Sequence, residues 1–171
     1  MRSTKKQLGI SVLEVVISLA VIGLIVAGAV GLGSGAFSSQ STVGMTQEVT
    51  SIRNNVKGLY SKSTSYGTAS LNSQLIDTKA FPDYLKIDTT TSTVTNSFNG
   101  TISVTGASSN FTIAYTLVPK DICVKHIAQA GSGGLQSVSV NGATALTVPV
   151  TPAQAQTACD TATNSITWTT S

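Results

Sequence analysis

An apolar run near the N-terminus constrains this chain more than any other feature. Among the 23 positions from Ile10 to Leu32, one side chain is charged, that of Glu14. At about 1.5 Å per residue, a helix of this length reaches about 35 Å, enough to cross a bilayer core of about 30 Å. We therefore expect a hydrophobic transmembrane helix over residues 10–35. The 171-residue chain then has room for one further domain.

Basic residues at the start of the chain favour one orientation of this helix. Arg2, Lys5 and Lys6 precede the apolar run, and no comparable cluster follows closely. The positive-inside rule therefore places the N-terminus in the cytoplasm and the rest of the chain outside. These three residues also account for the net charge of +3, because seven basic and seven acidic residues remain after position 9. Such a neutral remainder argues against nucleic-acid binding through a basic face.

Three interpretations of the apolar run compete. A cleaved secretory signal would use Ala27-Gly28-Ala29 as its small-x-small site, but the run is too long for a signal and Glu14 lies near its start. A plain membrane anchor has the right length but leaves Glu14 unexplained, since a carboxylate in a membrane segment is unfavourable by a few kcal/mol. The third interpretation, a short leader that ends at Gly9, accounts for every residue.

The leader MRSTKKQLG and the following stretch ISVLEVVISLAVIGLIVAG resemble the N-terminal segment of type IV pilins. The resemblance combines a basic leader, a Gly at its end, a Glu at the fifth mature position and a long apolar run. It implies that a prepilin peptidase cuts after Gly9 and methylates the new amino terminus at Ile10. It also implies that the Glu14 carboxylate pairs with the Ile10 α-amine of a neighbouring subunit, which would set register during assembly.

After the apolar run, the pattern becomes that of an amphipathic helix, which we expect over residues 36–60. A lone amphipathic helix is only marginally stable, so its apolar side must pack on the downstream chain. We predict an α+β fold, a long N-terminal helix packed on an antiparallel β-sheet, which is also the architecture that the pilin resemblance implies. The apolar positions recur at three- and four-residue steps and are Met45, Val49, Ile52, Val56 and Leu59.

The region before the sheet, residues 61–96, is rich in Ser and Thr and is expected to form a loop. Leu71, Leu75 and Ile76 predict a short helix within it, which Phe81-Pro82 would end. Tyr66 and Tyr84 are interpreted as packing anchors.

Strand and turn signals dominate from residue 100 onward. We expect a turn at Gly106 and Ser109, and a hairpin turn at Asn141-Gly142. Thr151, Pro152 and Gln154 predict the start of a helix with a capping box. One face of the second strand should carry Phe111, Ile113, Tyr115 and Leu117. The expected elements are strands 100–104 and 110–118, helix 121–129, strands 135–140 and 145–150, a helix to 161, and a last strand 165–169 carrying Trp168.

Cys123 and Cys159 are the two cysteines of the chain. In an exported domain an even pair implies a disulfide, and type IV pilins typically carry one that bounds a variable region near the C-terminus. Residues 123–159 are expected to be that region. The alternative, Cys123 and His126 as a metal or nucleophile pair, is disfavoured because a zinc site needs three or four ligands and the chain has one His.

No enzyme is indicated by the remaining residues. The chain lacks a nucleotide-binding Gly loop, an HExxH motif and a GxSxG motif, and the spacing of Asp77, Asp83 and Asp88 fits no EF-hand loop. We therefore expect no catalytic residue, cofactor or metal.

The resemblance gives the whole chain an expected organisation: leader 1–9, transmembrane and assembly helix 10–35, amphipathic half 36–60, and globular head 61–171. It implies a structural subunit of a bacterial type IV pilus, most like the type IVb pilins. The subunit would wait in the inner membrane with its head in the periplasm, then polymerise into an extracellular filament for adhesion, aggregation or mating contact. Expected partners are further copies of the chain, the prepilin peptidase, and an assembly ATPase, inner-membrane platform and secretin.

Two alternatives to this function stay open. Within the class, the chain could be a minor pilin or a pseudopilin of a type II secretion system. From another class, it could be a signal-anchored or secreted binding module that does not polymerise.

Overall fold

The computed structural model describes residues 12–129 and 134–171, without the side chains of residue 14 and residues 21–38. The predicted leader, Gly9 and Ile10 therefore lie outside the described residues. Residues from Ser39 to Ser171 form one compact unit, and the residues before Ser39 form another.

The long N-terminal helix, α1 (Val12–Leu59), continues for 48 residues. Within its first part, apolar side chains such as Val12, Leu13 and Leu19 are exposed. In the part of the chain that the structure describes, no helix has both the length and the apolar character of a membrane span. For most of the predicted transmembrane segment, residues 10–35, the side chains lie outside the described part of the chain.

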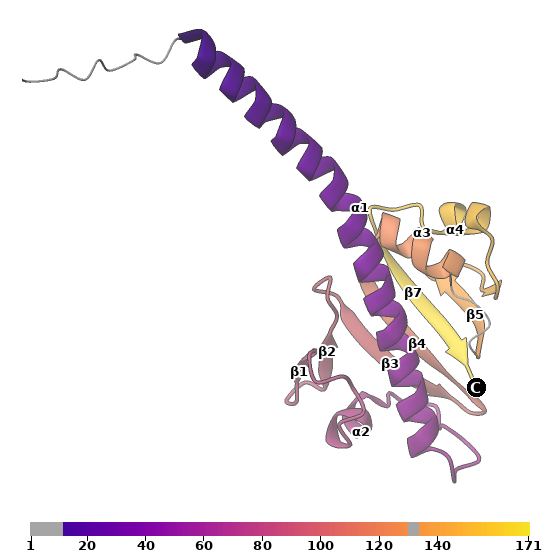
Figure 1. The fold of residues 1–171 in the computed structure, drawn as a ribbon. Coiled ribbons are helices and arrows are strands. Elements are labelled where there is room, and N and C mark those ends of the chain that lie inside the picture. The colour runs from indigo at the N-terminus through magenta and orange to yellow at the C-terminus, as the bar shows by residue number, and fades with distance from the viewer. Residues whose placement is uncertain (1–11, 130–133) are drawn as a thin grey trace, which may run out of the picture. The chain divides into compact units, whose positions relative to one another are not determined.

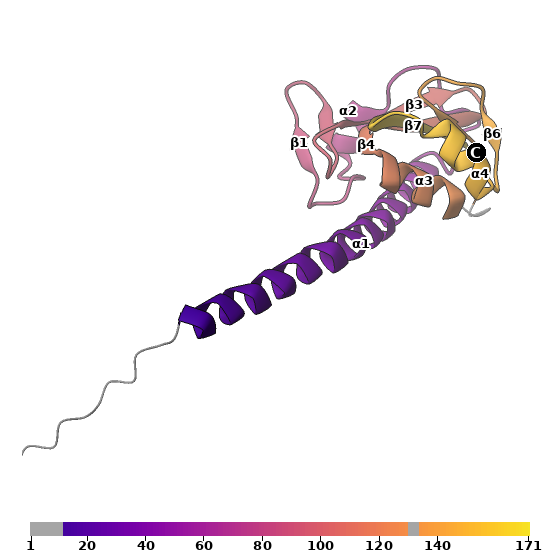
Figure 2. The same ribbon diagram turned by 90° about the horizontal axis from the view of Figure 1, so that it is seen from above.

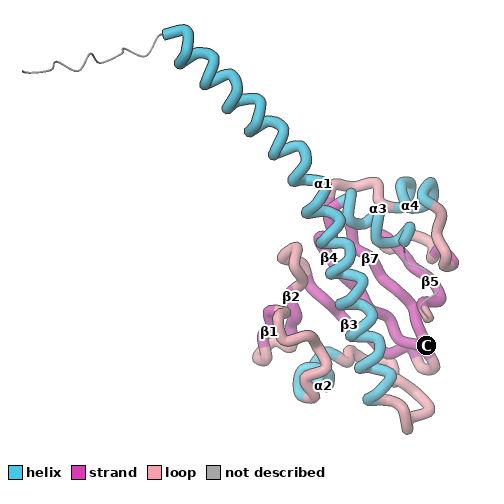
Figure 3. Tube along the Cα trace, in the orientation of Figure 1, coloured by secondary structure: helices cyan, strands magenta, loops and turns pink. Residues whose placement is uncertain are grey.

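The head is built on a seven-stranded antiparallel sheet with the order β1-β2-β3-β4-β7-β5-β6 (Figure 1). The last strand of the chain, β7, lies between β4 and β5 and pairs with both. The C-terminal strand therefore joins the two parts of the sheet, as the trace in Figure 3 shows. The strands are β1 (Lys86–Asp88), β2 (Thr93–Thr95), β3 (Thr101–Ala107), β4 (Asn110–Pro119), β5 (Leu135–Val140), β6 (Leu146–Thr147) and β7 (Thr163–Thr170).

Helical segments of the head cover one side of this sheet, here called the inner face (Figure 2). The second part of α1, residues 39–59, crosses the middle strands, and α3 (Lys120–Gln129) lies on the same side. A short helix, α4 (Pro152–Ala158), packs on α3, and α2 (Asn72–Asp77) contacts β3. The α+β prediction of a long helix on an antiparallel sheet is therefore confirmed.

The predicted apolar stripe of α1 forms the centre of the core. Met45, Val49, Ile52 and Val56 are buried against the sheet, whereas Leu59, the last residue of the helix, is 45% exposed. Removing each of the larger side chains from water stabilises the fold by about 1.5–3 kcal/mol. The largest fully buried side chains opposite the helix are those of Trp168, Tyr115, Phe111, Ile102, Ile113 and Ile166.

Several local predictions in the C-terminal half are confirmed. Strand β5 has the predicted bounds, and the turn after it uses Asn141 and Gly142 at φ of 53° and 73°, the left-handed conformation that such turns need. Thr151 and Gln154 form the expected capping box at the start of α4. That helix ends at Ala158 rather than at residue 161, because Cys159 already leaves helical geometry.

The face assignment in β4 was wrong at its end. Leu117 was expected to point inward with Tyr115, but it is 48% exposed and has a φ of 57°. The pairing of β4 with β7 shifts register between Tyr115 and Val118, so an extra residue is inserted there. This bulge turns Leu117 outward and puts Val118 in the core.

The predicted position of the turn in the hairpin of β3 and β4 was also wrong. Strand β3 continues to Ala107, so Gly106 lies within the strand and the turn falls on Ser108 and Ser109. Gly106 is needed inside the strand because a Cβ atom there would collide with the carbonyl oxygen of Tyr66.

Residues 61–96 contain more structure than a loop with one helix. The strands β1 and β2 pair with each other and extend the sheet beyond β3. The predicted short helix is present as α2, but it ends at Asp77, since Lys79 has a φ of 52°. Strand β6 is shorter than the predicted 145–150 and consists of Leu146 and Thr147.

The two tyrosines of this region differ from each other. Tyr66 packs as predicted, with its ring centroid 5.3 Å from that of Tyr60 and 4.8 Å from that of Phe111. Tyr84 is 69% exposed, so its interpretation as a packing anchor was wrong.

The position of Trp168 leads to a stability prediction. We expect Trp168→Ala to lower the free energy of unfolding by about 3–5 kcal/mol, because it removes a large, fully buried side chain from the central strand. The neighbouring Thr169 faces away from the helices, so Thr169→Ala should change stability by less than about 1 kcal/mol. Urea unfolding followed by circular dichroism measures both. Equal effects of the two substitutions would contradict the assigned faces of β7.

Candidate functional site

The residues that the sequence singled out for assembly lie at the start of the chain. Gly9 and Ile10 are outside the described residues, and Glu14 lies in α1 with its side chain outside the description. The arrangement of these three residues therefore lies outside the described part of the chain. What it does describe is how the same helix is held by the head, and this contact contains polar groups that the sequence reasoning missed.

Glu48 is the buried acid of this contact, with 4% of its surface exposed. Its carboxylate accepts a hydrogen bond of 3.2 Å from the Tyr115 hydroxyl on β4 and one of 3.4 Å from the Ser97 hydroxyl. Burial raises the pKa of Glu48, although both hydrogen bonds act in the opposite direction. The pKa of Tyr115 is raised as well, first by burial and then by the charge of Glu48, so the phenol stays a donor.

His126, on α3, is the buried base, with 2% of its surface exposed. Its Nδ1 atom lies 3.2 Å from the Thr46 hydroxyl on α1. Burial lowers its pKa to about 4, so the imidazole is neutral at pH 7. The ring meets the indole of Trp168 edge-on, with centroids 5.1 Å apart and planes at 79°.

These groups form one connected cluster, here called the aromatic cluster, made of Tyr115, His126 and Trp168. Tyr115 and Trp168 also meet edge-on, with centroids 5.4 Å apart, a geometry that adds about 0.5–1.5 kcal/mol to burial. The cluster joins β4, β7 and α3, and each of its ends contacts α1, through Glu48 and Thr46. It therefore fixes where α1 lies along the sheet.

A second polar contact ties α1 to the sheet further along the helix. The Arg53 Nε atom donates a 2.8 Å hydrogen bond to the Thr170 hydroxyl on β7, which in turn donates to the carbonyl oxygen of Gly134. Gly134 has a φ of 88°, and a Cβ atom there would collide with the Arg53 guanidinium. A side chain at this position would be strained at this φ and would displace the guanidinium.

Spacing could have revealed Glu48. It lies three residues after Met45 and four before Ile52, so it falls on the buried stripe of the helix. An acid at such a position needs a polar partner in the core. The sequence gives no comparable signal for His126, because its partners Thr46 and Trp168 come from distant parts of the chain.

The region bounded by the cysteines begins within α3 and ends after α4. Cys123 on α3 and Cys159 at the end of α4 are both buried and are joined in a disulfide, as predicted. In the chain-entropy model, closing a loop with a sequence separation of 36 stabilises the fold by about 4 kcal/mol. The bridge therefore fastens α4 to the rest of the head.

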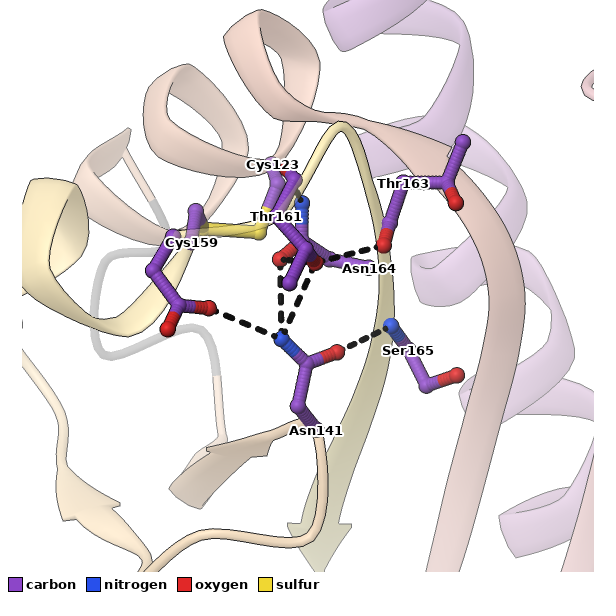
Figure 4. Close-up of a disulfide and its surroundings, with 8 residues drawn as sticks. Cys123, Asn141, Cys159, Thr161, Thr163, Asn164 and Ser165 are labelled. Carbon is purple, nitrogen blue, oxygen red and sulfur yellow. Dashed lines mark hydrogen bonds between the residues drawn. A yellow bond between two sulfur atoms is a disulfide. The ribbon is translucent and has the colours of Figure 1, made fainter.

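A hydrogen-bond network beside the disulfide fastens the hairpin that follows β5 (Figure 4). The Asn141 amide donates to the Asn164 side chain at 2.9 Å and accepts from the Ser165 backbone N–H at 2.9 Å. Thr161 donates to the same Asn164 oxygen at 2.9 Å. The turn of the bounded region is thus held against the start of β7.

Possible metal ligands are dispersed over the head. Asp88 serves the turn after β1, where it accepts hydrogen bonds from the backbone N–H groups of Thr90 and Thr91. These bonds lower the pKa of its carboxyl group. Within residues 12–129 and 134–171, no three side chains of His, Cys, Asp or Glu are arranged to hold a metal ion.

A long helix held on an antiparallel sheet, with a disulfide-bounded region near the C-terminus, is the architecture of the type IV pilins. The family model described as PilS N terminal matches residues 39–171. The chain therefore belongs to this family of pilins.

Two curated proteins named major structural subunit of bundle-forming pilus are similar over most of their length. The one from Escherichia coli O111:H- is 32% identical over 174 residues, which cover 91% of this chain and 89% of that protein. The one from Escherichia coli O127:H6 is 30% identical over 176 residues with the same coverage. Among solved structures, the type IVb pilin from Salmonella typhi has a TM-score of 0.59 and 23% identity, covering 71% of this chain and 94% of that one. This last likeness supports the fold.

The burial of His126 predicts a specific dependence of stability on pH. Because its pKa is about 4 in the folded state and about 6.5 in the unfolded state, the unfolded chain binds more protons between these values. The contribution of His126 is therefore complete above pH 6.5 and is lost as the pH falls towards 4, by about 3 kcal/mol in total. Urea unfolding at pH 7, 6, 5 and 4 should show this loss in the wild type and not in His126→Gln.

Glu48 provides the matched control, because its raised pKa has the opposite sign. The folded state binds the proton of Glu48 more readily than the unfolded state does, so this residue adds stability as the pH falls. Glu48→Gln should therefore make the acid-induced loss of stability steeper. An unchanged pH profile in His126→Gln would show that another group causes the loss.

Proposed function

We propose that this chain is the major subunit of a type IVb pilus, cut after Gly9, methylated at Ile10 and polymerised through α1. The observation that carries the proposal is the similarity to two major pilus subunits over 91% of the chain. This similarity favours a major pilin over a minor pilin or a pseudopilin. It also favours a structural role over an enzymatic one or that of a separate binding module.

The exposed apolar side chains of α1 support polymerisation through this helix. Val12, Leu13, Val16, Ile17 and Leu19 are each more than half exposed in the single chain. A continuous apolar surface of this kind is stable in water only when something covers it. We infer that the bilayer covers it before assembly and that neighbouring copies of α1 cover it in the filament.

The charge of the leader and the resemblance of the N-terminal segment to type IV prepilins support a route to the filament. The subunit waits in the inner membrane with its N-terminus in the cytoplasm and its head in the periplasm. The prepilin peptidase removes the leader, and an assembly ATPase, an inner-membrane platform and a secretin bring the filament to the cell surface. Among the expected roles of the pilus, aggregation is favoured because both relatives are named as subunits of a bundle-forming pilus.

Glu14 gives the test of this proposal. In apolar surroundings its carboxylate would pair with the α-amine of Ile10 in the neighbouring subunit, and breaking a buried pair costs about 3–5 kcal/mol. We therefore expect Glu14→Gln and Glu14→Ala to be processed like the wild type but to yield no filaments in sheared fractions. Gln40→Ala, at an exposed position of the same helix, is the control and should assemble normally. Normal filaments from both Glu14 variants would contradict the proposed assembly role.

A further inference from the structure

The face of the sheet opposite the helices has an unusual composition. The strands β3, β4, β7, β5 and β6 contain no Asp, Glu, Lys or Arg at any position. Charged side chains occur in the sheet only at its far edge, with Lys86 and Asp88 on β1. Edge strands ordinarily carry features such as charged side chains that prevent association with other chains, and the edge strand β6 contains no charge.

The strand register aligns the outward side chains into rows. In one row, the outward residues of five neighbouring strands are Thr105, Thr112, Thr169, Ser137 and Thr147. In the next row, those of four strands are Ser103, Ala114, Thr167 and Ser139. We call these two rows the hydroxyl face. Eight of its nine side chains carry a hydroxyl group.

The hydroxyl face is open in the head. Its side chains are half-buried or exposed, whereas the alternate residues of the strands β3 and β7, and those of β4 up to Tyr115, are buried. The helices α1 and α3 both lie on the inner face, and the contact of Thr46 with His126 joins them there. The hydroxyl face is therefore on the side of the sheet opposite α3 and the second part of α1, residues 39–59.

We propose that the hydroxyl face docks onto the hydroxyl face of a second copy of this chain in a neighbouring filament. The inference rests on the proposed function, since it presupposes filaments built around α1. A two-fold contact between identical faces pairs residues i and j reciprocally and brings residues near the axis against their own copies, so a charge at the centre of the face would meet its own like. A hydroxyl both donates and accepts hydrogen bonds and is complementary to itself. The absence of charge and the abundance of hydroxyls are what such a contact requires.

The size of the face explains why the contact would act only between filaments. Five strands at about 4.8 Å spacing span about 19 Å, and the two rows, two residues apart along each strand, are separated by about 7 Å. Each head therefore offers a few hundred Å², well below the roughly 800 Å² per partner of a stable complex. One contact is too weak to hold two heads, but many contacts in parallel along two filaments bind far more strongly.

Thr167 is the position from which to test the contact. It lies in the central strand of the face, between Ala114 and Ser139 on the adjacent strands, and both of these are small enough to leave room for a longer side chain. We expect filaments of Thr167→Lys to form in wild-type numbers and to show a roughly tenfold or greater loss of bundling, because each parallel contact is weakened. Electron microscopy gives the filament number and the fraction of filaments in bundles.

Three further conditions make the test specific. Thr89→Lys, at an exposed position after β1, adds the same charge outside the hydroxyl face and should bundle like the wild type. Salt at about 1 M, where the Debye length is about 3 Å, should restore bundling of Thr167→Lys by screening its repulsion. Mixing Thr167→Lys filaments with Thr167→Glu filaments should also restore bundles, which would show that the two faces meet directly. Should Thr167→Lys yield no filaments, Ser139→Lys on β5 takes its place.

The outcomes separate this inference from the proposed function. Normal filaments with unchanged bundling in the Lys variants would overturn the inference and leave the proposed function standing. Unchanged bundling together with lost attachment to other cells would assign the face to a different ligand and would also overturn it. A wild-type chain that forms no filaments at all would instead contradict the proposed function.

Discussion

The packing of the second part of α1 on the inner face of the sheet is the contact on which the rest of the head depends. Its apolar residues Met45, Val49, Ile52 and Val56 provide most of the driving force. Hydrophobic contact is not directional, so it would also tolerate a helix displaced along the sheet. The directional contacts of Glu48 with Tyr115, and of Arg53 with Thr170, oppose such a displacement.

Because α1 packs on the inner face alone, the two faces of the sheet have different roles. Alternation along each strand sends large apolar side chains such as Trp168 and Tyr115 to the helix and sends Thr and Ser to the opposite side. The head reaches stability through one face and through the disulfide between Cys123 and Cys159. Its other face is then free to have a composition suited to contacts between copies of the chain.

Sequence patterns predicted the elements whose signals are local. The apolar stripe of α1, the Asn141-Gly142 turn and the capping box of Thr151 each depend on residues within one or two turns of each other. The outward position of Leu117 could not be predicted in this way, since it results from a register shift against β7, about fifty residues away in sequence. The strands β1 and β2 were missed for a related reason: three-residue strands have too few positions to show alternation.

In the candidate site, too, residues in a local motif could be predicted, whereas residues that meet only in the folded chain could not. The leader, Gly9, Ile10 and Glu14 form a local motif, so they could be singled out from the sequence, and their roles remain predictions. The aromatic cluster could not be predicted, because Tyr115, His126 and Trp168 meet only after the sheet has formed. Burial of an acid and a base at the same helix contact is a property of the folded chain.

We propose that this chain is a prepilin whose N-terminal helix becomes the assembly element of a filament. The most direct test is the intact mass of the protein expressed with and without a prepilin peptidase. We expect loss of residues 1–9 and gain of one methyl group, only when the peptidase is present. Cleavage after Ala29, or a mass that does not depend on the peptidase, would contradict it.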